Sequence, residues 1–469
     1  MRRSTEKKAI WLSIAVLLFG VVSGFGQGPG QRPMLQDIKV YREEPVPSST
    51  PLVKKTGSSQ ATNADVSVPS LSGVKTSIPI LAETPIPGYS GVLVESLDGK
   101  VVVENGSELA YNPASNVKVA TTYAVLKSYG PNFRFPTNIW TDGSYEQETA
   151  TIHGNLYISG KDPVFSFEDA VRIANVLNQM GIRTIKGDLV VTDNFGMNYS
   201  GSPATSSRVL FATLDATKRS AAATRAWGSF RVNSGQLMQL NEMPSVSFSG
   251  SVYVQPMPGN LNLLFTHESA PMRDIVKAMM CYSNNELSEA LGDMVGGPYA
   301  IARTVQQDTG SLPMEFSLQT ASGLGINRVT PRAMMKLLRQ LRSQLEGWKM
   351  SFTDIMPVAG MDDGTLEGRF ASDYSRGSVV GKTGTLARTD SGVSALSGEI
   401  TTRGGKFLFV IFNQRGSVAR FRSFQNDYIS LIQSQFGGPA PLSYAPTSLD
   451  ARLARTRITY PQSRPRISD

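Results

Sequence analysis

Cysteine and histidine are scarce in this chain of 469 residues, and their scarcity excludes several kinds of chemistry. The single cysteine, Cys281, rules out an internal disulfide framework and any Cys-rich zinc or iron–sulfur site. The two histidines, His153 and His267, are too few for a His-based metal site or a Ser-His-Asp triad. We therefore expect no metal and no cofactor, and chemistry that proceeds without histidine.

Extremes of charge and hydrophobicity are missing as well. Hydrophobic residues make up 40% of the chain and charged residues 18%, which excludes a disordered, a collagen-like and a polytopic membrane protein. The 46 Lys and Arg residues exceed the 38 Asp and Glu residues by a mild +8. This excess fits an anionic neighbour better than sequence-specific nucleic-acid binding, so no nucleic-acid partner is expected. The length predicts about two or three domains.

The N-terminal segment, residues 1–26, is typical of an export signal. It reads MRRSTEKK followed by the apolar run AIWLSIAVLLFGVVSGFG, which is a basic region before an uncharged one. The apolar run is at the lower limit of length for crossing a bilayer, so it is interpreted as a signal peptide or as an uncleaved membrane anchor. We therefore expect an exported protein of the periplasm or cell envelope, with any membrane association made through this segment.

Two further segments lack apolar periodicity. Residues 27–85 are rich in Pro, Ser, Thr and Gly and are predicted to form a flexible tether. Residues 438–469 form a basic, Pro-rich segment that contains RLARTRITYPQSRPR and is predicted to be a solvated tail. Contact of this tail with anionic cell-wall or membrane polymers is the alternative interpretation.

A Ser-x-x-Lys motif opens the first predicted helix of the ordered region, in YNPASNVKVATTYAVLKSYG. Ser115 and Lys118 are three residues apart and so share one face at its N-terminal end, where the helix dipole favours negative charge on the serine oxygen. A lysine there can take the serine proton if burial and a second cation lower its pKa. The same spacing also occurs at Ser4–Lys7 and Ser72–Lys75, but these pairs lie in the predicted export signal and tether. Their position therefore excludes them as catalytic candidates. Without partners, the pair would only be a solvated first helical turn.

The partners occur in two later motifs. A helical pattern in MRDIVKAMMCYSNNELSEALGDMVGG is interrupted at Ser283-Asn284-Asn285, and an apolar strand-like run in SVVGKTGTL leads into Lys382-Thr383-Gly384-Thr385. Taken singly, the former could be helix caps and the latter a charged strand edge. Two more strand candidates and a helix-like FRSFQNDYISLIQSQF follow. This order predicts an antiparallel sheet with a packed terminal helix.

Ser-x-x-Lys, Ser-x-Asn and Lys-Thr-Gly in this order are the motif set of penicillin-binding proteins and class A β-lactamases. From about residue 90 to 436 the chain resembles the low-molecular-mass class C penicillin-binding proteins, the D-alanyl-D-alanine carboxypeptidase/endopeptidase family. The resemblance extends to NPASNVKVATTYAVLKSYGPNFRF, GNLYISGKDPVFSFEDAV, PVAGMDDGTLEGRF and VSALSGE. It implies an α+β fold: a transpeptidase-like domain of antiparallel sheet and helical subdomain from residues 86–140 and 265–437, with a reduced inserted domain at 141–264.

The resemblance also implies roles for the motif residues. Ser115 would be the acylated nucleophile and Lys118 its general base, while Ser283 would relay a proton to the departing D-alanine amine. Asn285 would orient Lys118 and bind the substrate peptide. The substrate-binding residues would be those of the third motif, Lys382, Thr383, Gly384 and Thr385. Their side chains would hold the terminal carboxylate of the substrate. The backbone N–H groups of Ser115 and Thr385 would form the oxyanion hole.

Two departures from the family and three alternatives accompany this interpretation. The insertion between the first two motifs is shorter than usual, and QTASGLGIN lacks the acidic residue common at its position, so no function is assigned to that loop. The alternatives are a serine β-lactamase or esterase, for which no acidic deacylation base can be assigned, a catalytically silent wall-binding module, and a structural envelope protein. Peptidoglycan peptides are the expected substrate and β-lactams the expected covalent inhibitors. The motifs leave open carboxypeptidase against endopeptidase action, the diamino acid preferred and the oligomeric state.

Overall fold

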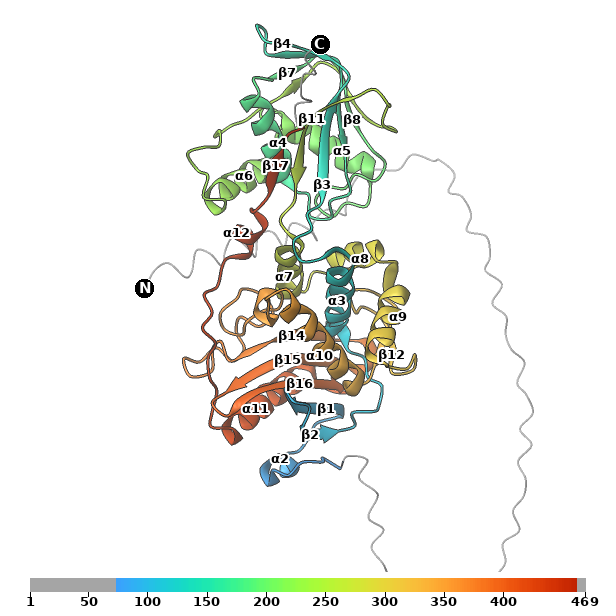
Figure 1. Ribbon diagram of the computed structural model, residues 1–469, viewed down its shortest axis with the longest axis vertical. Coiled ribbons are helices and arrows are strands. Elements are labelled where there is room, and N and C mark those ends of the chain that lie inside the picture. Colours follow the sequence, from blue (N-terminus) through green and yellow to red (C-terminus); the bar gives the residue numbers. More distant parts are fainter. Residues whose placement is uncertain (1–72, 462–469) are drawn as a thin grey trace, which may run out of the picture. The chain divides into compact units, whose positions relative to one another are not determined.

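The computed structural model describes residues 73–461, so the predicted export signal and most of the predicted tether lie outside the described residues. One part of it is a five-stranded antiparallel sheet with the strand order β14-β15-β16-β1-β2 (Figure 1). The tight turn between the first two strands contains Gly99 at φ +96° and confirms the hairpin expected at Asp98-Gly99. The bounds of the five strands are β1 Tyr89–Ser96, β2 Val101–Asn105, β14 Val379–Leu386, β15 Val393–Thr402 and β16 Gly405–Gln414.

Both faces of this sheet are covered, and β16 shows how the sequence brings this about. Its side chains are apolar at consecutive positions, and alternate residues point to opposite faces of a strand. Leu408, Val410 and Phe412 join the core beneath the helical layer, whereas Phe409 and Ile411 join the core beneath α11, Val418–Gln435. Figure 1 shows α10 and α11 on opposite sides of the strands. The helical layer consists of α3 Val117–Tyr129, α7 Met272–Tyr282, α8 Asn285–Met294, α9 Gly297–Thr309 and α10 Pro331–Gly347.

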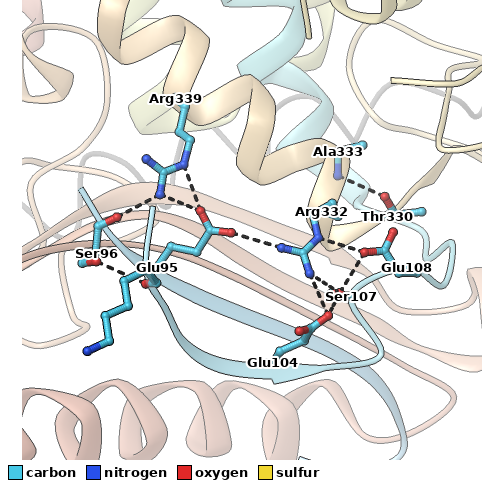
Figure 2. A network of polar contacts seen from close by, with 10 residues as sticks. Glu95, Ser96, Glu104, Ser107, Glu108, Thr330, Arg332, Ala333 and Arg339 are labelled. Atoms are coloured by element: carbon cyan, nitrogen blue, oxygen red, sulfur yellow. Dashed lines mark hydrogen bonds and ion pairs between the residues drawn. The ribbon is translucent and has the colours of Figure 1, made fainter. Parts of the chain in front are cut away.

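A polar network joins the edge of this sheet to α10 (Figure 2). The carboxylate of Glu95, on β1, accepts hydrogen bonds from the guanidinium groups of Arg332 and Arg339. Arg332 also donates to Glu104 and Glu108, at 2.7 and 2.8 Å. Each of these charged side chains therefore has an opposite charge within ion-pair distance, and the network holds the helix in register on the strands.

The inserted region is built around a second sheet, of six strands in the order β10-β8-β6-β3-β11-β17. Its helices are α4 Phe167–Gln179, α5 Pro203–Leu214 and α6 Ala221–Asn233. Since β3 and β11 both belong to this sheet, the inserted region extends from residue 136 to 268, somewhat beyond the expected 141–264. The bounds of its strands are β3 Pro136–Thr141, β6 Leu156–Ser159, β8 Leu189–Val191, β10 Val252–Val254, β11 Asn262–Glu268 and β17 Arg457–Thr459.

Short elements complete the described chain. A four-stranded sheet in the order β4-β5-β7-β9 lies in the inserted region, and a two-stranded sheet of β12 and β13 precedes α10. Among the helices of residues 73–461, none is both long and apolar enough to cross a membrane. The bounds of these strands are β4 Ser144–Glu146, β5 Thr151–His153, β7 Thr184–Ile185, β9 Ser247–Phe248, β12 Phe316–Ser317 and β13 Arg328–Val329.

The predicted tether and tail are wrong where the structure describes them. Residues 73–85 contain α2, Pro79–Glu83, whose Leu81 is completely buried, and the backbone of Lys75 pairs with that of Glu104. Residues 438–461 contain α12, Leu449–Leu453, and β17, which pairs with β11. The first segment is held by apolar packing of Leu81 and by backbone pairing, and the second by strand pairing and ion pairs. These contacts are made with other elements of the fold, which local composition cannot reveal.

Candidate active site

Ser115 lies in a short 3₁₀ turn, Ala114–Asn116, that leads directly into α3. The strand β14 passes close to this turn at Gly384, where a Cβ atom would come within 2.8 Å of the Pro113 carbonyl and 3.0 Å of the Ser115 nitrogen. A glycine is therefore required at this point for the strand and the turn to approach. This close approach brings the first and third motifs together at one edge of the five-stranded sheet.

Lys118 is completely buried in the first turn of α3, and its ammonium group has three oxygen neighbours. Its Nζ lies 3.2 Å from the Ser115 Oγ and 2.8 Å from the Asn285 Oδ1, and it donates to the Ser322 carbonyl at 2.6 Å. The spacing of Ser115 and Lys118 thus gives the contact expected from the sequence. Asn285 joins them from the second motif.

The second motif is a break between two helices. α7 ends at Ser283, which adopts left-handed dihedral angles (φ 56°, ψ 39°), and α8 begins immediately afterwards. The Asn284 side chain caps α8 by accepting a hydrogen bond from the Leu287 N–H at 2.9 Å. The interruption of the helical pattern therefore turns the chain so that Ser283 and Asn285 both face the nucleophile.

The third motif supplies a second buried lysine. The Nζ of Lys382 donates to the Ser283 Oγ and to the Thr383 carbonyl, each at 2.8 Å, and the side chain is fully buried. Thr383, Gly384 and Thr385 line a cavity of about 640 Å³ together with Ser115, Ser283 and Asn285, whereas Lys382 is not among its lining residues. Six of the eight predicted site residues therefore line one cavity, and the two buried lysines, Lys118 and Lys382, lie behind its wall.

Burial controls the ionisation of both lysines. It lowers the pKa of Lys118 to about 8, and the negative charges of Glu289 and Glu286 partly oppose this shift. Burial also lowers the pKa of Lys382 well below its usual range, with the positive charge of Lys118 as the next cause. Of the two causes expected from the sequence for the lowered pKa of Lys118, burial is confirmed, whereas the second cation is not among the causes; the neighbouring charges that act on Lys118 are carboxylates, which raise its pKa.

Sequence reasoning missed the loop that supplies the third neighbour of Lys118. The carboxylate of Glu289, one turn beyond Asn285 on α8, accepts the N–H groups of Ala321 and Ser322 at 3.0 and 2.9 Å. Gly323 follows at φ +91°, and a Cβ there would collide with the Ala114 carbonyl. The segment QTASGLGIN, to which no function was assigned, is thus fixed against the nucleophile turn. A glutamate at helical spacing from Asn285 was the available signal.

Five polar residues that line the cavity were also missed, namely Thr365, Arg369, Ser394, Arg422 and Asn426. The Nη2 of Arg422, on α11, donates to the Thr385 Oγ1 at 2.8 Å. Arg369 donates to the Asn426 Oδ1 at 2.8 Å. α11 was expected as a closing helix, but no spacing rule connects its residues to the Lys-Thr-Gly strand, because the contact depends on where the helix crosses the sheet.

Comparison with known proteins agrees with the fold. A predatory peptidoglycan endopeptidase from Bdellovibrio bacteriovorus has a similar structure, with a TM-score of 0.66 at 19% identity, covering 80% of this chain and all of that one. Penicillin-binding protein 4 from Haemophilus influenzae gives a TM-score of 0.54 at 22% identity and covers 76% of this chain and 99% of that one. The expected α+β fold is confirmed, and it is the fold of the penicillin-binding serine peptidases.

The chain belongs to the D-Ala-D-Ala carboxypeptidase 3 (S13) family, whose model matches residues 80–205 and 229–429. A D-alanyl-D-alanine carboxypeptidase from an Actinomadura species is 26% identical over 456 residues, covering 75% of this chain and 82% of its own length. A carboxypeptidase from Mycolicibacterium smegmatis is 24% identical over 462 residues, covering 89% of this chain and 95% of its own. The protein is therefore a serine-type DD-peptidase, a hydrolase, and the family resemblance drawn from the sequence is confirmed.

Proposed function

We propose that this enzyme cleaves the D-Ala-D-Ala bond, or the equivalent cross-link, of peptidoglycan stem peptides through an acyl-enzyme on Ser115. The observation that supports it best is the position of Lys118. Its amine lies 3.2 Å from the Ser115 Oγ, is completely buried, and has a pKa of about 8, so a useful fraction is neutral near physiological pH. A neutral amine at this distance can accept the hydroxyl proton.

In the acylation step, the Ser115 Oγ forms a bond to the carbonyl carbon of the penultimate D-alanine as Lys118 takes the hydroxyl proton. The backbone N–H groups of Ser115 and Thr385 would stabilise the oxyanion. The C–N bond then breaks as the Ser283 hydroxyl, which accepts a hydrogen bond from Lys382, passes its proton to the leaving amine. The proton that Lys118 took from Ser115 then restores the Ser283 hydroxyl, so that Lys118 is a neutral base again. Water cleaves the acyl ester in the second half of the reaction and restores the serine.

The remaining motif residues position these groups. Asn285 accepts a hydrogen bond from Lys118 and also lines the cavity, so it can orient the base and bind the substrate peptide. Thr383 and Thr385 would donate hydroxyl hydrogen bonds to the substrate. A β-lactam would acylate Ser115 by the same first step. Because the amine released by ring opening stays attached to the acyl group, it does not diffuse away, and the ester remains in place.

The substrate also suggests where the enzyme works. The structurally similar Bdellovibrio protein is a peptidoglycan endopeptidase, and it has also been solved in a form acylated by penicillin G. Because peptidoglycan lies outside the cytoplasmic membrane, we infer that residues 1–26 direct export to the periplasm or cell envelope, and that an uncleaved segment would keep the enzyme at the membrane.

Mass spectrometry of the intact protein after exposure to a penicillin tests this proposal. We expect a stable adduct of one penicillin per chain on the peptide that contains Ser115. None of the residues that line the described cavity is acidic, so no carboxylate there could serve as the deacylation base that a class A β-lactamase uses. An adduct that disappears within seconds while penicillin is consumed would instead indicate a β-lactamase. No adduct and no release of D-alanine would favour the catalytically silent alternative.

A further inference from the structure

Two guanidinium groups, those of Arg422 and Arg369, line the active-site cavity. Within residues 73–461, neither forms an ion pair with a carboxylate, and no acidic residue is among those lining the cavity. Arg422 is held by its hydrogen bond to the Thr385 Oγ1. The positive charge of Arg422, after burial, is a cause of the lowered pKa of Arg369. An anion bound here would relieve this repulsion.

Lys382, the residue expected to hold the substrate carboxylate, is placed differently. Its ammonium is buried behind the cavity wall, and its hydrogen bonds go to the Ser283 Oγ and the Thr383 carbonyl. A carboxylate that enters the cavity beside Thr385 meets Arg422 first. The division of labour is therefore different from the expected one: Lys382 serves the proton relay at Ser283, and the exposed cation beside the Lys-Thr-Gly strand comes from α11.

We propose that Arg422 is the specificity-determining residue that binds the carboxylate next to the scissile bond, acting together with the Thr385 hydroxyl. This rests on the proposed function and names the group that selects its substrate. The Thr385 Oγ1 accepts from Arg422, which leaves its own proton free to donate to the anion. The guanidinium group of Arg422 keeps further N–H donors beyond the one used on Thr385, and the planar fork of arginine matches a carboxylate.

Both substrates of the proposed function supply this anion. In a carboxypeptidase substrate it is the terminal carboxylate of D-alanine, and in a cross-link it is the free carboxylate on the residue that follows the scissile bond. A peptide whose carboxylate has been converted to an amide keeps its shape and loses its charge. The pair of acid and amide peptides therefore isolates recognition of the charge.

The test compares the full-length enzyme with three variants, Arg422→Ala, Arg422→Lys and Lys382→Ala, on an acyl-D-Ala-D-Ala peptide and on its C-terminal amide. The native enzyme should prefer the acid by about 10- to 150-fold in kcat/KM, the range for one charge-assisted hydrogen bond. In Arg422→Ala the rate on the acid should fall until this preference nearly vanishes, while the rate on the amide stays close to native. Arg422→Lys should restore part of the preference. Lys382→Ala should slow both peptides alike.

Arg420→Ala is the matched control, because Arg420 is exposed on the same helix and is not among the cavity residues. It should keep the native rates and the native preference. A native acid preference that survives in Arg422→Ala, or that disappears selectively in Lys382→Ala, would overturn the assignment. Mass spectrometry after prolonged exposure to penicillin separates this from failure of the proposed function: Arg422→Ala should still become fully acylated, whereas a native protein that forms no adduct would refute the underlying activity itself.

Discussion

Charged side chains gather at two places beside the five-stranded sheet, and the two clusters differ in how their charges are balanced. In the network of Figure 2, the buried Glu95 contacts two guanidinium groups, and Arg332 contacts three carboxylates. The hydrogen bond from Ser107 and the charge of Arg332 lower the pKa of Glu104. Each charged side chain of this network therefore has an opposite charge beside it.

The catalytic cluster has the opposite arrangement. Lys118 and Lys382 are completely buried, and in the described part of the chain neither has a carboxylate within ion-pair distance. Their neighbours are hydroxyl, amide and carbonyl oxygens. Another buried lysine, Lys277, lies 2.6 Å from the Asp362 carboxylate. A buried lysine without a counter-ion beside it can serve as a base, because burial then favours the neutral amine.

Loss of the nucleophile should have the largest effect on activity. Ser115→Ala should abolish both penicillin labelling and release of D-alanine, since no other hydroxyl lies beside the Lys118 amine in the cavity. Circular dichroism and thermal unfolding should match the native protein because the hydroxyl faces the cavity. Ser72→Ala, which alters a Ser-x-x-Lys outside the described residues, should change nothing. Full labelling of Ser115→Ala would place the nucleophile elsewhere.

The unpaired state of Lys118 predicts a specific pH dependence. Only the neutral amine can take the serine proton, and with a pKa of about 8 roughly a tenth of it is neutral at pH 7. The rate of acylation by a penicillin should therefore rise nearly tenfold per pH unit below 8 and level off above it. Stopped-flow or quench measurements between pH 6 and 9.5 check this. A rate that is flat or falls over this range would contradict the assignment of Lys118 as the base.

A smaller effect on the rate is expected from substitution of Glu289, whose negative charge acts most strongly on Lys118. Glu289→Gln removes a negative charge that raises the pKa of Lys118, so the midpoint of the pH profile should move to lower pH. The substitution also loosens the Ser322 loop, because a glutamine cannot accept both backbone N–H groups, and the plateau rate should fall several-fold.

Glu286→Gln is the matched control for Glu289. Its charge also raises the pKa of Lys118, but the Ala321 and Ser322 N–H groups bond to Glu289 and not to it. This variant should lower the midpoint while leaving the plateau rate near native. If both variants behave alike, Glu289 acts through its charge alone and does not position the loop.

The paired network should influence stability and leave catalysis unchanged. Arg332→Ala removes the cation shared by three carboxylates and leaves Glu95 and Glu104 less well compensated, which should lower the free energy of unfolding by about 2 kcal/mol. Urea unfolding measures this, and kcat/KM of the folded enzyme should be native. Lys336→Ala on the same helix serves as the control. A change in the pH midpoint in Arg332→Ala would couple the two clusters.

Deletion of the N-terminal flank should have the smallest effect on activity. An enzyme lacking residues 27–72 should retain native kcat/KM. Extending the deletion to residue 85 also removes the buried Leu81 and the backbone pairing of Lys75 with Glu104 at the edge strand β2. This longer deletion should lower the thermal midpoint by several degrees without altering the pH profile. Equal thermal midpoints would mean that α2 adds no stability.

Much of the site was predictable because its residues lie in three short motifs, each on an element with a recognisable pattern. The helix after Ser115, the break at Ser283 and the strand carrying Lys382 all appear where the sequence indicates them. What escaped prediction depends on how distant elements cross. Arg422 reaches Thr385 because α11 packs on β15. The Glu289 carboxylate accepts the Ser322 N–H because the loop that contains Gly323 packs against the Ser115 turn. The ordered segments at 73–85 and 438–461 escaped for the same reason, since they contact elements that are not their neighbours in the sequence, such as α11 for Leu81 and β11 for β17.

Because β17 pairs with β11, the sheet that contains them cannot be completed until nearly all of the described chain has been synthesised. The two strands contact each other through pairs such as Arg457 and Glu268, which are 189 residues apart. At a synthesis rate of about 5–20 residues per second, the outer edge of β11 waits on the order of 10–40 s for its partner. During that interval the sheet has only its first five strands, and β11 presents an unpaired edge that can associate with another chain. Chaperone binding should therefore matter most for nascent chains that have already formed α10 and the catalytic sheet but have not yet released residues 457–459.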